Sequence, residues 1–156
     1  IETIEGDIAG FLNDTNERAE LIVCMGDTIT HFNSYEQFDE MISRIAMILS
    51  KDGTVIFSWR DFSEERFGTD RFIHVRSDET RLMTCFLEYF PDRVVVYDIV
   101  HEKVDGSWRQ KASSYPKLRL PWARVNSIVA SHHIAVCHQQ VIRGMIYLIG
   151  RKANRK

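Results

Sequence analysis

The apolar positions of the chain begin with an unbroken run, continue at helical spacing, and end in a second unbroken run. Leu21 to Met25 are apolar without alternation, which is typical of a strand covered on both faces. Gly26 and Asp27 end this run, and Thr54 to Trp59 form the second one. The pattern predicts a strand, an amphipathic helix and a second strand. The apolar face of that helix comprises Phe38, Met41, Ile42, Ile45, Ala46 and Leu49.

Both ends of the expected helix carry sequence signals. Ser34, with Gln37 three residues later, predicts a capping box at its start. Lys51-Asp52-Gly53 predicts a glycine stop at its end. The right-handed crossover of a βαβ unit places its two strands side by side and parallel. Gly26-Asp27 and Arg60-Asp61 then open onto one edge of the sheet, where ligands of open α/β sheets bind.

After Arg60 the unbroken apolar runs give way to an alternation of apolar and polar residues. This alternation predicts an antiparallel β insertion over residues 79–115. Two turns divide this stretch, Pro91-Asp92 and Asp105-Gly106, and the second is a strong short-range hairpin signal. We therefore expect an antiparallel meander. Its three strands are expected at Arg81–Tyr89, Arg93–Lys103 and Trp108–Tyr115.

The remaining segments predict one exposed connection, one helix and two closing strands. Ser63 to Asp78 is charged and has few apolar residues, so we expect an exposed or mobile connection that could serve as a lid. Pro121 suits the first turn of a helix that carries Val125, Ile128 and Val129 on one face. The closing strands are expected at Ile134–His138 and Val141–Gly150, followed by a frayed basic tail at Arg151–Lys156.

Composition narrows the class of protein. The chain has 156 residues, which suits one domain, and a formal charge of −2, which gives no field to attract nucleic acid. Its apolar runs are too short to span a bilayer, and its amino end has no export signal. Cys24, Cys85 and Cys137 are odd in number and widely spaced, so we expect buried thiols in a reducing, cytoplasmic compartment.

These motifs resemble the class I S-adenosylmethionine-dependent methyltransferases that act on small molecules, in particular the glycine N-methyltransferase-like members. The resemblance rests on Gly26-Asp27, His31, Gly53 and Arg60-Asp61, with Asp7 upstream, and it covers nearly the whole chain. It implies an α/β fold with a Rossmann-like methyltransferase sheet and an antiparallel β insertion. It also implies S-adenosylmethionine as the cofactor and a small molecule as the methyl acceptor.

The sequence departs from the family at its amino end. The acidic residue and Gly-x-Gly loop that follow the family's first strand are not in this sequence, so the N-terminal strands of the sheet are expected to be missing. We interpret residues 1–156 as a single domain, the C-terminal two-thirds of a methyltransferase domain within a larger polypeptide. Such a piece exposes a sheet edge and apolar surface, which makes a homo-oligomer possible.

The resemblance assigns the cofactor side of the cleft to Asp7, Ile8, Met25, Gly26, Asp27 and His31. Asp7 would accept a hydrogen bond from the adenine amino group, but Asp is also a favoured N-cap for a helix starting at Ile8. Asp27 would line the cleft or end the strand by an Asx-turn. His31 would contact the cofactor and is the best-placed general base, although a lone loop histidine also caps or stacks on a helix.

The substrate side is assigned to Arg60, Tyr115 and Arg119. The planar guanidinium of Arg60 suits a substrate carboxylate, and a salt bridge to Asp61 or Asp27 would explain this arginine equally well. Tyr115 and Arg119 flank a proline turn, where packing and a surface ion pair are the simpler explanations. Adjacent histidines at 132 and 133 point in different directions, so no metal site is expected.

Two other functions remain open. A methyltransferase-like domain without catalytic activity, which binds a protein partner, agrees equally with the missing glycine loop. A dehydrogenase is disfavoured, because no G-x-G-x-x-G motif follows any expected strand. We therefore predict methyl transfer to a small molecule.

Overall fold

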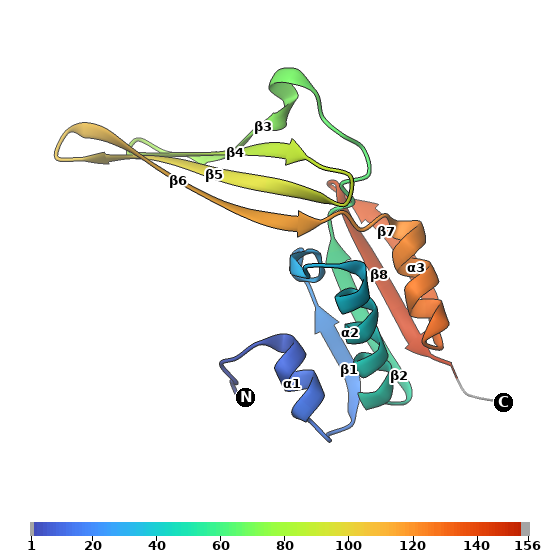
Figure 1. The fold of residues 1–156 in the computed structure, drawn as a ribbon. Helices are drawn as coiled ribbons and strands as arrows, with labels where there is room; N and C mark the ends of the chain where they lie inside the picture. The colour runs from blue at the N-terminus through green and yellow to red at the C-terminus, as the bar shows by residue number, and fades with distance from the viewer. Residues whose placement is uncertain (1, 154–156) are drawn as a thin grey trace. The chain divides into compact units, whose positions relative to one another are not determined.

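The computed structural model describes residues 2–153 and divides the chain into two compact units (Figure 1). One unit comprises Ile1–Asp61 together with Leu120–Lys156, and the other is Phe62–Arg119. The first unit contains a four-stranded sheet in the order β1-β2-β8-β7. Its elements are α1 (Ile8–Asp14), β1 (Ala19–Cys24), the 3-10 helix η1 (Thr28–His31), α2 (Tyr35–Ile48), β2 (Leu49–Trp59), α3 (Trp122–Ser131), β7 (Ile134–Ile142) and β8 (Met145–Lys152).

The predicted βαβ unit is confirmed, since β1 pairs in parallel with β2 and α2 connects them. Ser34 caps α2, its side chain accepting a hydrogen bond from the Gln37 amide at 3.3 Å. The Gln37 side chain accepts a hydrogen bond from the Asn33 amide at 3.1 Å. In a capping box this donor is the amide of the N-cap residue, here Ser34, so the observed bond lies one residue earlier than expected. Four residues of the predicted apolar face are buried beneath the helix: Phe38, Met41, Ile42 and Ile45.

The predicted glycine stop of this helix is wrong. α2 ends at Ile48, and Lys51-Asp52-Gly53 lies inside β2. The left-handed residue is Asp52, at φ 61°, while Gly53 serves a close approach between strands. A Cβ on Gly53 would lie 2.9 Å from the Ser50 carbonyl oxygen and 3.2 Å from that of Ala19. Glycine is needed there for two reasons: the backbone of β2 folds close to itself at Ser50, and β1 approaches at Ala19, a contact that local sequence does not reveal.

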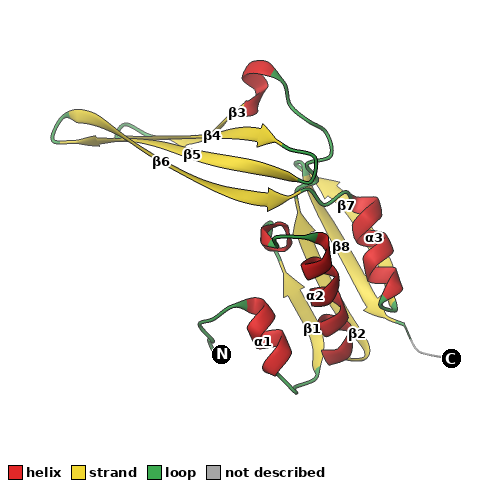
Figure 2. Cartoon of the chain, viewed as in Figure 1, coloured by secondary structure: helices red, strands yellow, loops and turns green. Residues whose placement is uncertain are grey.

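The sheet of this unit has two different faces, and the expectation that both are covered is wrong. Figure 2 shows α2 and α3 on the same face. On that face Val55, Phe57 and Trp59 of β2 are all 0% exposed. On the other face Leu21 and Val23 of β1 are 56% and 53% exposed. Within residues 2–153, helices therefore cover one face of the sheet only.

The closing helix and two strands are present as predicted, but the boundaries of both strands differ: β7 is longer than expected and β8 begins later. Pro121 immediately precedes α3, which buries Val125 and Val129. β7 continues to Ile142, so the turn lies at Arg143-Gly144, where φ is positive, and not before Val141 as predicted. Lys152, predicted in a frayed tail, belongs to β8 and donates to the Leu49 carbonyl at 2.7 Å. The rest of that tail, residues 154–156, lies outside the described residues.

The second unit is an antiparallel sheet in the order β3-β4-β5-β6. The predicted meander is confirmed, including the turn at Asp105-Gly106, where both residues have positive φ. A small core of Phe62, Leu87, Val94 and Val96 holds the sheet together. Its strands are β3 (Phe72–Ser77), β4 (Arg81–Tyr89), β5 (Arg93–Val104) and β6 (Ser107–Leu118), preceded by the 3-10 helix η2 (Gly68–Arg71).

One element of this unit is not expected from the sequence. Residues 72–77, predicted as part of an exposed connection or lid, form β3 and pair with β4. Phe72 lies opposite Phe86, with ring centroids 4.8 Å apart. Phe72, Ile73 and Val75 are residue types that favour strands, so the sequence did contain a local signal for β3, while its pairing with β4 comes from the tertiary fold. The sheet accordingly extends beyond the predicted range 79–115 at both ends.

Candidate functional site

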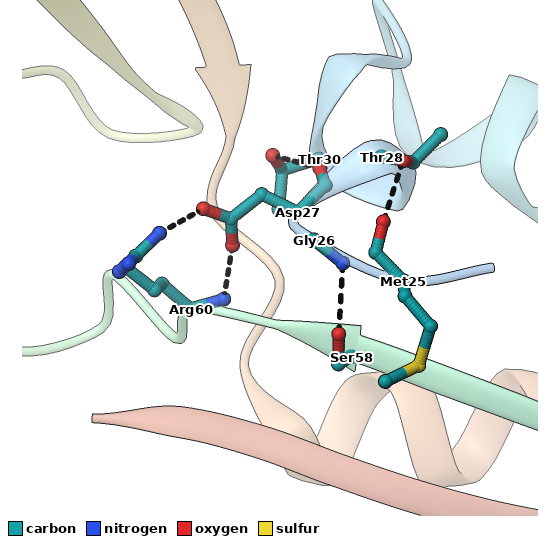
Figure 3. Close-up of polar contacts among 7 residues, drawn as sticks. All are labelled: Met25, Gly26, Asp27, Thr28, Thr30, Ser58 and Arg60. Atoms are coloured by element: carbon teal, nitrogen blue, oxygen red, sulfur yellow. Dashed lines mark hydrogen bonds and ion pairs between the residues drawn. The ribbon is translucent and has the colours of Figure 1, made fainter. Parts of the chain in front are cut away.

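The loop that leaves the carboxyl end of β1 is tied to the neighbouring strand by one residue, Ser58. The Gly26 amide donates to the Ser58 hydroxyl at 2.8 Å (Figure 3), and the Asp27 amide donates to the Ser58 carbonyl at 3.1 Å. Both loop residues are left-handed, with φ of 76° for Gly26 and 71° for Asp27. The strand thus turns sharply at the edge where the two predicted motifs were expected to meet.

Asp27 joins the ends of the two parallel strands. Its side chain is 2% exposed, and one carboxylate oxygen accepts the Arg60 amide while the other accepts a guanidinium hydrogen of Arg60 (Figure 3). The structure therefore brings Asp27 and Arg60 together, in one of the two salt bridges that were weighed against substrate binding for Arg60. Arg60 engages both carboxylate oxygens, Ser58 accepts from the Asp27 amide and Thr30 donates to the Asp27 carbonyl, so the role of Asp27 toward a cofactor stays a prediction.

Arg60 keeps part of its charged group accessible. Its side chain is 51% exposed although one guanidinium nitrogen pairs with the buried Asp27 carboxylate. The planar guanidinium carries five N–H donors, so this pair does not use all of them. Its predicted role in binding substrate stays a prediction, now with a defined anchor for the side chain.

Two threonines shape the loop after Asp27. Thr28 donates its hydroxyl to the Met25 carbonyl at 2.8 Å, and Thr30 donates its hydroxyl to the Asp27 carbonyl at 2.7 Å (Figure 3). These bonds start η1 and present Met25 at the surface, where it is 42% exposed. Burial raises the pKa of the neighbouring Cys24 thiol, while a hydrogen bond with Thr28 acts in the opposite direction.

A cavity of about 430 Å³ lies beside this loop and brings together three of the predicted cofactor residues, Asp7, Ile8 and His31. Its volume is in the usual range for small-molecule sites. The lining is mixed, with Leu12 and Met41 among the apolar residues. It also contains polar groups from both helices, which are Asn13, Gln37, Glu40 and Arg44.

Asp7 has the local role that its position allows. It is the N-cap of α1, and its Oδ2 accepts a hydrogen bond from the Gly10 amide at 3.0 Å. The cap is compatible with a second role, because a carboxylate has two oxygens and a cap engages one. Ile8, the first residue of the helix, is 41% exposed. The cofactor roles of both residues remain predictions.

His31 is the last residue of η1 and lines the cavity, so it lies where a ligand in that cavity would meet it. The helix cap that competes with this role in the sequence belongs to another residue, because Ser34 caps α2. Its functions as a cofactor contact and as a base stay predictions.

Tyr115 and Arg119 belong to the second unit and serve its packing. Tyr115 packs against the core formed by Phe62 and its neighbours. Arg119 is 13% exposed and donates to Glu65 at 2.6 Å, to the Phe90 carbonyl at 2.9 Å and to the Ser63 carbonyl at 3.0 Å. These contacts agree with the structural alternative for Arg119, and its role in binding substrate stays a prediction.

The site predicted from the sequence did not include Ser58, which accepts hydrogen bonds from both Gly26 and Asp27. Its signal in the sequence was a hydroxyl inside the otherwise apolar run from Val55 to Trp59, where a buried polar group needs a partner. The sequence could not say that the partner is a backbone amide on a different strand, 32 residues away.

Metal ligation has no visible basis in this part of the chain. Within residues 2–153, no group of three or more His, Cys, Asp or Glu side chains could hold a metal ion. His132 instead faces Asp39 of α2, with Nε2 and Oδ1 3.0 Å apart.

None of the helices in the described range is long and apolar enough to cross a membrane.

Comparison with known proteins identifies the fold. No protein-family model and no curated protein sequence matches the chain. CalS10, an amino pentose methyltransferase from Micromonospora echinaspora solved with bound S-adenosylmethionine, matches with a TM-score of 0.78 and 10% identity, over 95% of this chain and 63% of that chain. Streptomyces venezuelae DesVI matches with a TM-score of 0.72 and 15% identity, over 96% and 64%.

A third match is an S-adenosylmethionine-dependent methyltransferase from Clostridium acetobutylicum, with a TM-score of 0.72 and 10% identity, over 90% of this chain and 61% of that chain. The chain therefore spans less than two thirds of the length of these proteins. At such low identity the likeness establishes the fold alone. The predicted fold class, a Rossmann-like methyltransferase sheet with an antiparallel β insertion, is confirmed.

Proposed function

We propose that this chain, which has the fold of the class I methyltransferases, forms part of an S-adenosylmethionine-dependent enzyme that methylates a small molecule. The observation that carries the proposal is the loop at Gly26-Asp27, fixed at the carboxyl edge of two parallel strands beside a cavity lined by Asp7 and His31. Ligands of open α/β sheets bind at this edge.

The residues of the cavity suit the cofactor. Asp7 supplies a carboxylate that can accept from an adenine amino group, and Ile8 and Met41 supply apolar contacts for a base. Met25, exposed at the neighbouring loop, offers a polarizable thioether to the same ligand. Asp7, Ile8, Met25, Gly26, Asp27 and His31 would therefore hold S-adenosylmethionine, as the sequence resemblance implies.

When bound, this cofactor supplies an electrophilic sulfonium methyl group. The protein's own contribution is positioning, because holding two reactants in a near-attack geometry can supply about 7 to 11 kcal/mol. The bonded loop around Asp27 provides a rigid wall for that purpose. His31 would remove a proton from a hydroxyl acceptor, whereas an amine acceptor would need only to arrive deprotonated.

Arg60 is the proposed substrate anchor of the first unit. Its pairing with the buried Asp27 holds the guanidinium at the sheet edge, and its half-exposed side chain can receive an acidic group. The sequence resemblance also assigns substrate roles to Tyr115 and Arg119, which lie in the second unit and stay predictions. The matched structures include an amino pentose methyltransferase and a sugar N-methyltransferase, so amino sugars that also carry an acidic group for Arg60 are the first acceptors to screen.

The exposed apolar face of the first sheet favours a second candidate function. Leu21 and Val23 stand on a sheet face that the described helices leave uncovered, and such patches mark interaction sites. A methyltransferase-like domain without catalysis would use this face to bind a protein partner. The two candidates differ in a simple way, because only the enzyme needs to bind the cofactor.

Calorimetric titration with S-adenosylmethionine and S-adenosylhomocysteine tests the proposal, on this chain and on the longest natural polypeptide that contains it. Asp7→Ala removes the helix cap as well as the carboxylate, so Asp7→Ser is the sharper variant, since serine still caps. We expect micromolar binding by the longer polypeptide, weakened in both variants, and unchanged in the control Asp14→Ser at the other end of α1.

The outcomes separate the two candidates. Loss of binding in Asp7→Ala but not in Asp7→Ser would assign Asp7 to the cap alone. Absence of binding by a well-folded longer polypeptide would reject the methyltransferase function and leave the partner-binding domain. Binding by the longer polypeptide but not by this chain would agree with the expectation that the N-terminal strands of the sheet are missing from this chain.

A further inference from the structure

The loop after β1 is held by more bonds than a strand end requires. The regular β1–β2 pairing reaches Cys24 and Phe57, and the loop lies beyond it. Ser58 continues the connection by accepting the amides of Gly26 and Asp27 through its hydroxyl and carbonyl oxygens. At 2% exposure, Ser58 is a buried polar residue whose hydroxyl is satisfied by the loop.

Asp27 adopts a conformation that needs support. A non-glycine residue at φ 71° is uncommon, although aspartate tolerates this region better than most residues. Its carbonyl accepts from the amide and the hydroxyl of Thr30, at 2.9 and 2.7 Å. Its carboxylate accepts from the amide and the guanidinium of Arg60. Strained residues that are so heavily bonded concentrate at ligand sites.

We propose that Ser58 and Asp27 are positioning residues with separate tasks: Ser58 sets the cofactor side of the cleft and Asp27 sets Arg60 on the substrate side. Figure 3 shows the two sets of bonds meeting at the Gly26-Asp27 peptide. Ser58 holds Gly26 and, through it, the exposed Met25. The inference rests on the proposed function, because both tasks concern the same cleft.

The two tasks predict different signatures. Ser58→Ala removes the acceptor of the Gly26 amide and leaves the Asp27–Arg60 pair in place. Asp27→Asn retains one oxygen for the Arg60 amide and tolerates a positive φ, but it turns a donor toward the guanidinium and releases it. The serine variant should therefore affect cofactor binding, and the asparagine variant should affect acceptor binding.

Amide hydrogen exchange, followed by NMR on the chain itself, tests the first task without any ligand. In Ser58→Ala we expect the Gly26 amide to exchange about tenfold faster or more, because it loses its intramolecular acceptor. Ser58→Thr, which keeps a hydroxyl, should restore protection. Ser50→Ala, at the opposite end of β2, is the matched control and should leave the Gly26 amide unchanged.

Titration of S-adenosylhomocysteine into the longest natural polypeptide tests the consequence. We expect the dissociation constant to rise about tenfold in Ser58→Ala, the cost of about one well-placed hydrogen bond, with the threonine variant near wild type. In Asp27→Asn we expect the smaller rise in that constant, while KM for an acidic acceptor rises more than it does in Ser58→Ala. The proposal is overturned if Ser58→Ala exposes the Gly26 amide yet binds like wild type.

The failure of this inference is distinguishable from failure of the proposed function. If the wild-type polypeptide does not bind S-adenosylhomocysteine, the function fails and the positioning tasks fail with it. If wild type binds and both variants weaken the cofactor and the acceptor equally, the function stands and the division of tasks between Ser58 and Asp27 is wrong.

Discussion

The two faces of the sheet in the first unit are built from the same apolar residue types but have different surroundings. Alternate residues of β2 point to opposite faces, so Phe57 is fully buried beneath the helices while its neighbour Ile56 is half-buried. Leu148 and Ile149 of β8 repeat this contrast opposite them. The comparison shows that an unbroken apolar run reports what a strand can bury, and neighbouring elements decide what it does bury.

The largest expected contrast is in stability. Phe57→Ala should lower the free energy of unfolding by about 3 to 5 kcal/mol, because it leaves a cavity under α2. Ile56→Ala, one residue away on the other face, should cost about 1 kcal/mol. Urea unfolding of the two variants measures both values. Equal costs would mean that the second face is also packed in solution.

The helix cap should have a moderate effect. Ser34→Ala removes the side chain that accepts the Gln37 amide at the start of α2, so we expect a loss of about 1 kcal/mol. Ser43→Ala, in the middle of the same helix, is the control and should be neutral or slightly stabilising, since alanine has the higher helix propensity. Thermal unfolding followed by circular dichroism compares the variants. A similar loss in both would contradict the assigned cap.

Charge on the uncovered face should change association more than stability. Leu21→Lys combined with Val23→Lys places two charges on the exposed edge strand, where we expect stability to change by less than about 0.5 kcal/mol. Self-association should fall, because charged edge strands resist pairing with another chain. Sedimentation velocity measures the effect, with Val141→Lys and Ile142→Lys on the opposite edge strand β7 as the matched control. A monomeric wild type would reject association through this face.

The reactivity of the cysteine thiols should show the same contrast between buried and exposed positions, without any substitution. Burial on the covered side raises the pKa of Cys24, so less of this thiol is ionised at any pH near neutrality, whereas Cys137 is exposed. Iodoacetamide should therefore label Cys137 first, as intact mass after short reaction times would show. Early labelling of Cys24 would mean that the covered face opens.

The same pKa shift gives a pH dependence. The folded chain holds the Cys24 proton more tightly than the unfolded chain does, so the free energy of unfolding should decrease as pH rises above the ordinary thiol pKa of about 8.5. Below that pH the shift in the Cys24 pKa does not make the free energy of unfolding depend on pH. Cys24→Ser should remove this decrease, and unfolding curves at several alkaline pH values compare the two proteins.

The order and type of the main elements followed from the sequence alone. Ser34 with its apolar helix face, the two runs ending at Gly26-Asp27 and Arg60, and the turn at Asp105-Gly106 each act over a few residues, so local chemistry determines them. The expectation that two strand ends share one sheet edge also held, because a right-handed crossover permits one arrangement.

Only the tertiary structure decided which partner each of these residues meets. Gly53 serves the close approach of β1, Ser58 receives an amide from a separate strand, and Arg60 pairs with Asp27. β3 forms against β4, and α2 and α3 both cover one sheet face. The physical reason is common to all of these cases: hydrogen bonding and burial are satisfied by groups distant in sequence, whose positions are known only once the chain has folded.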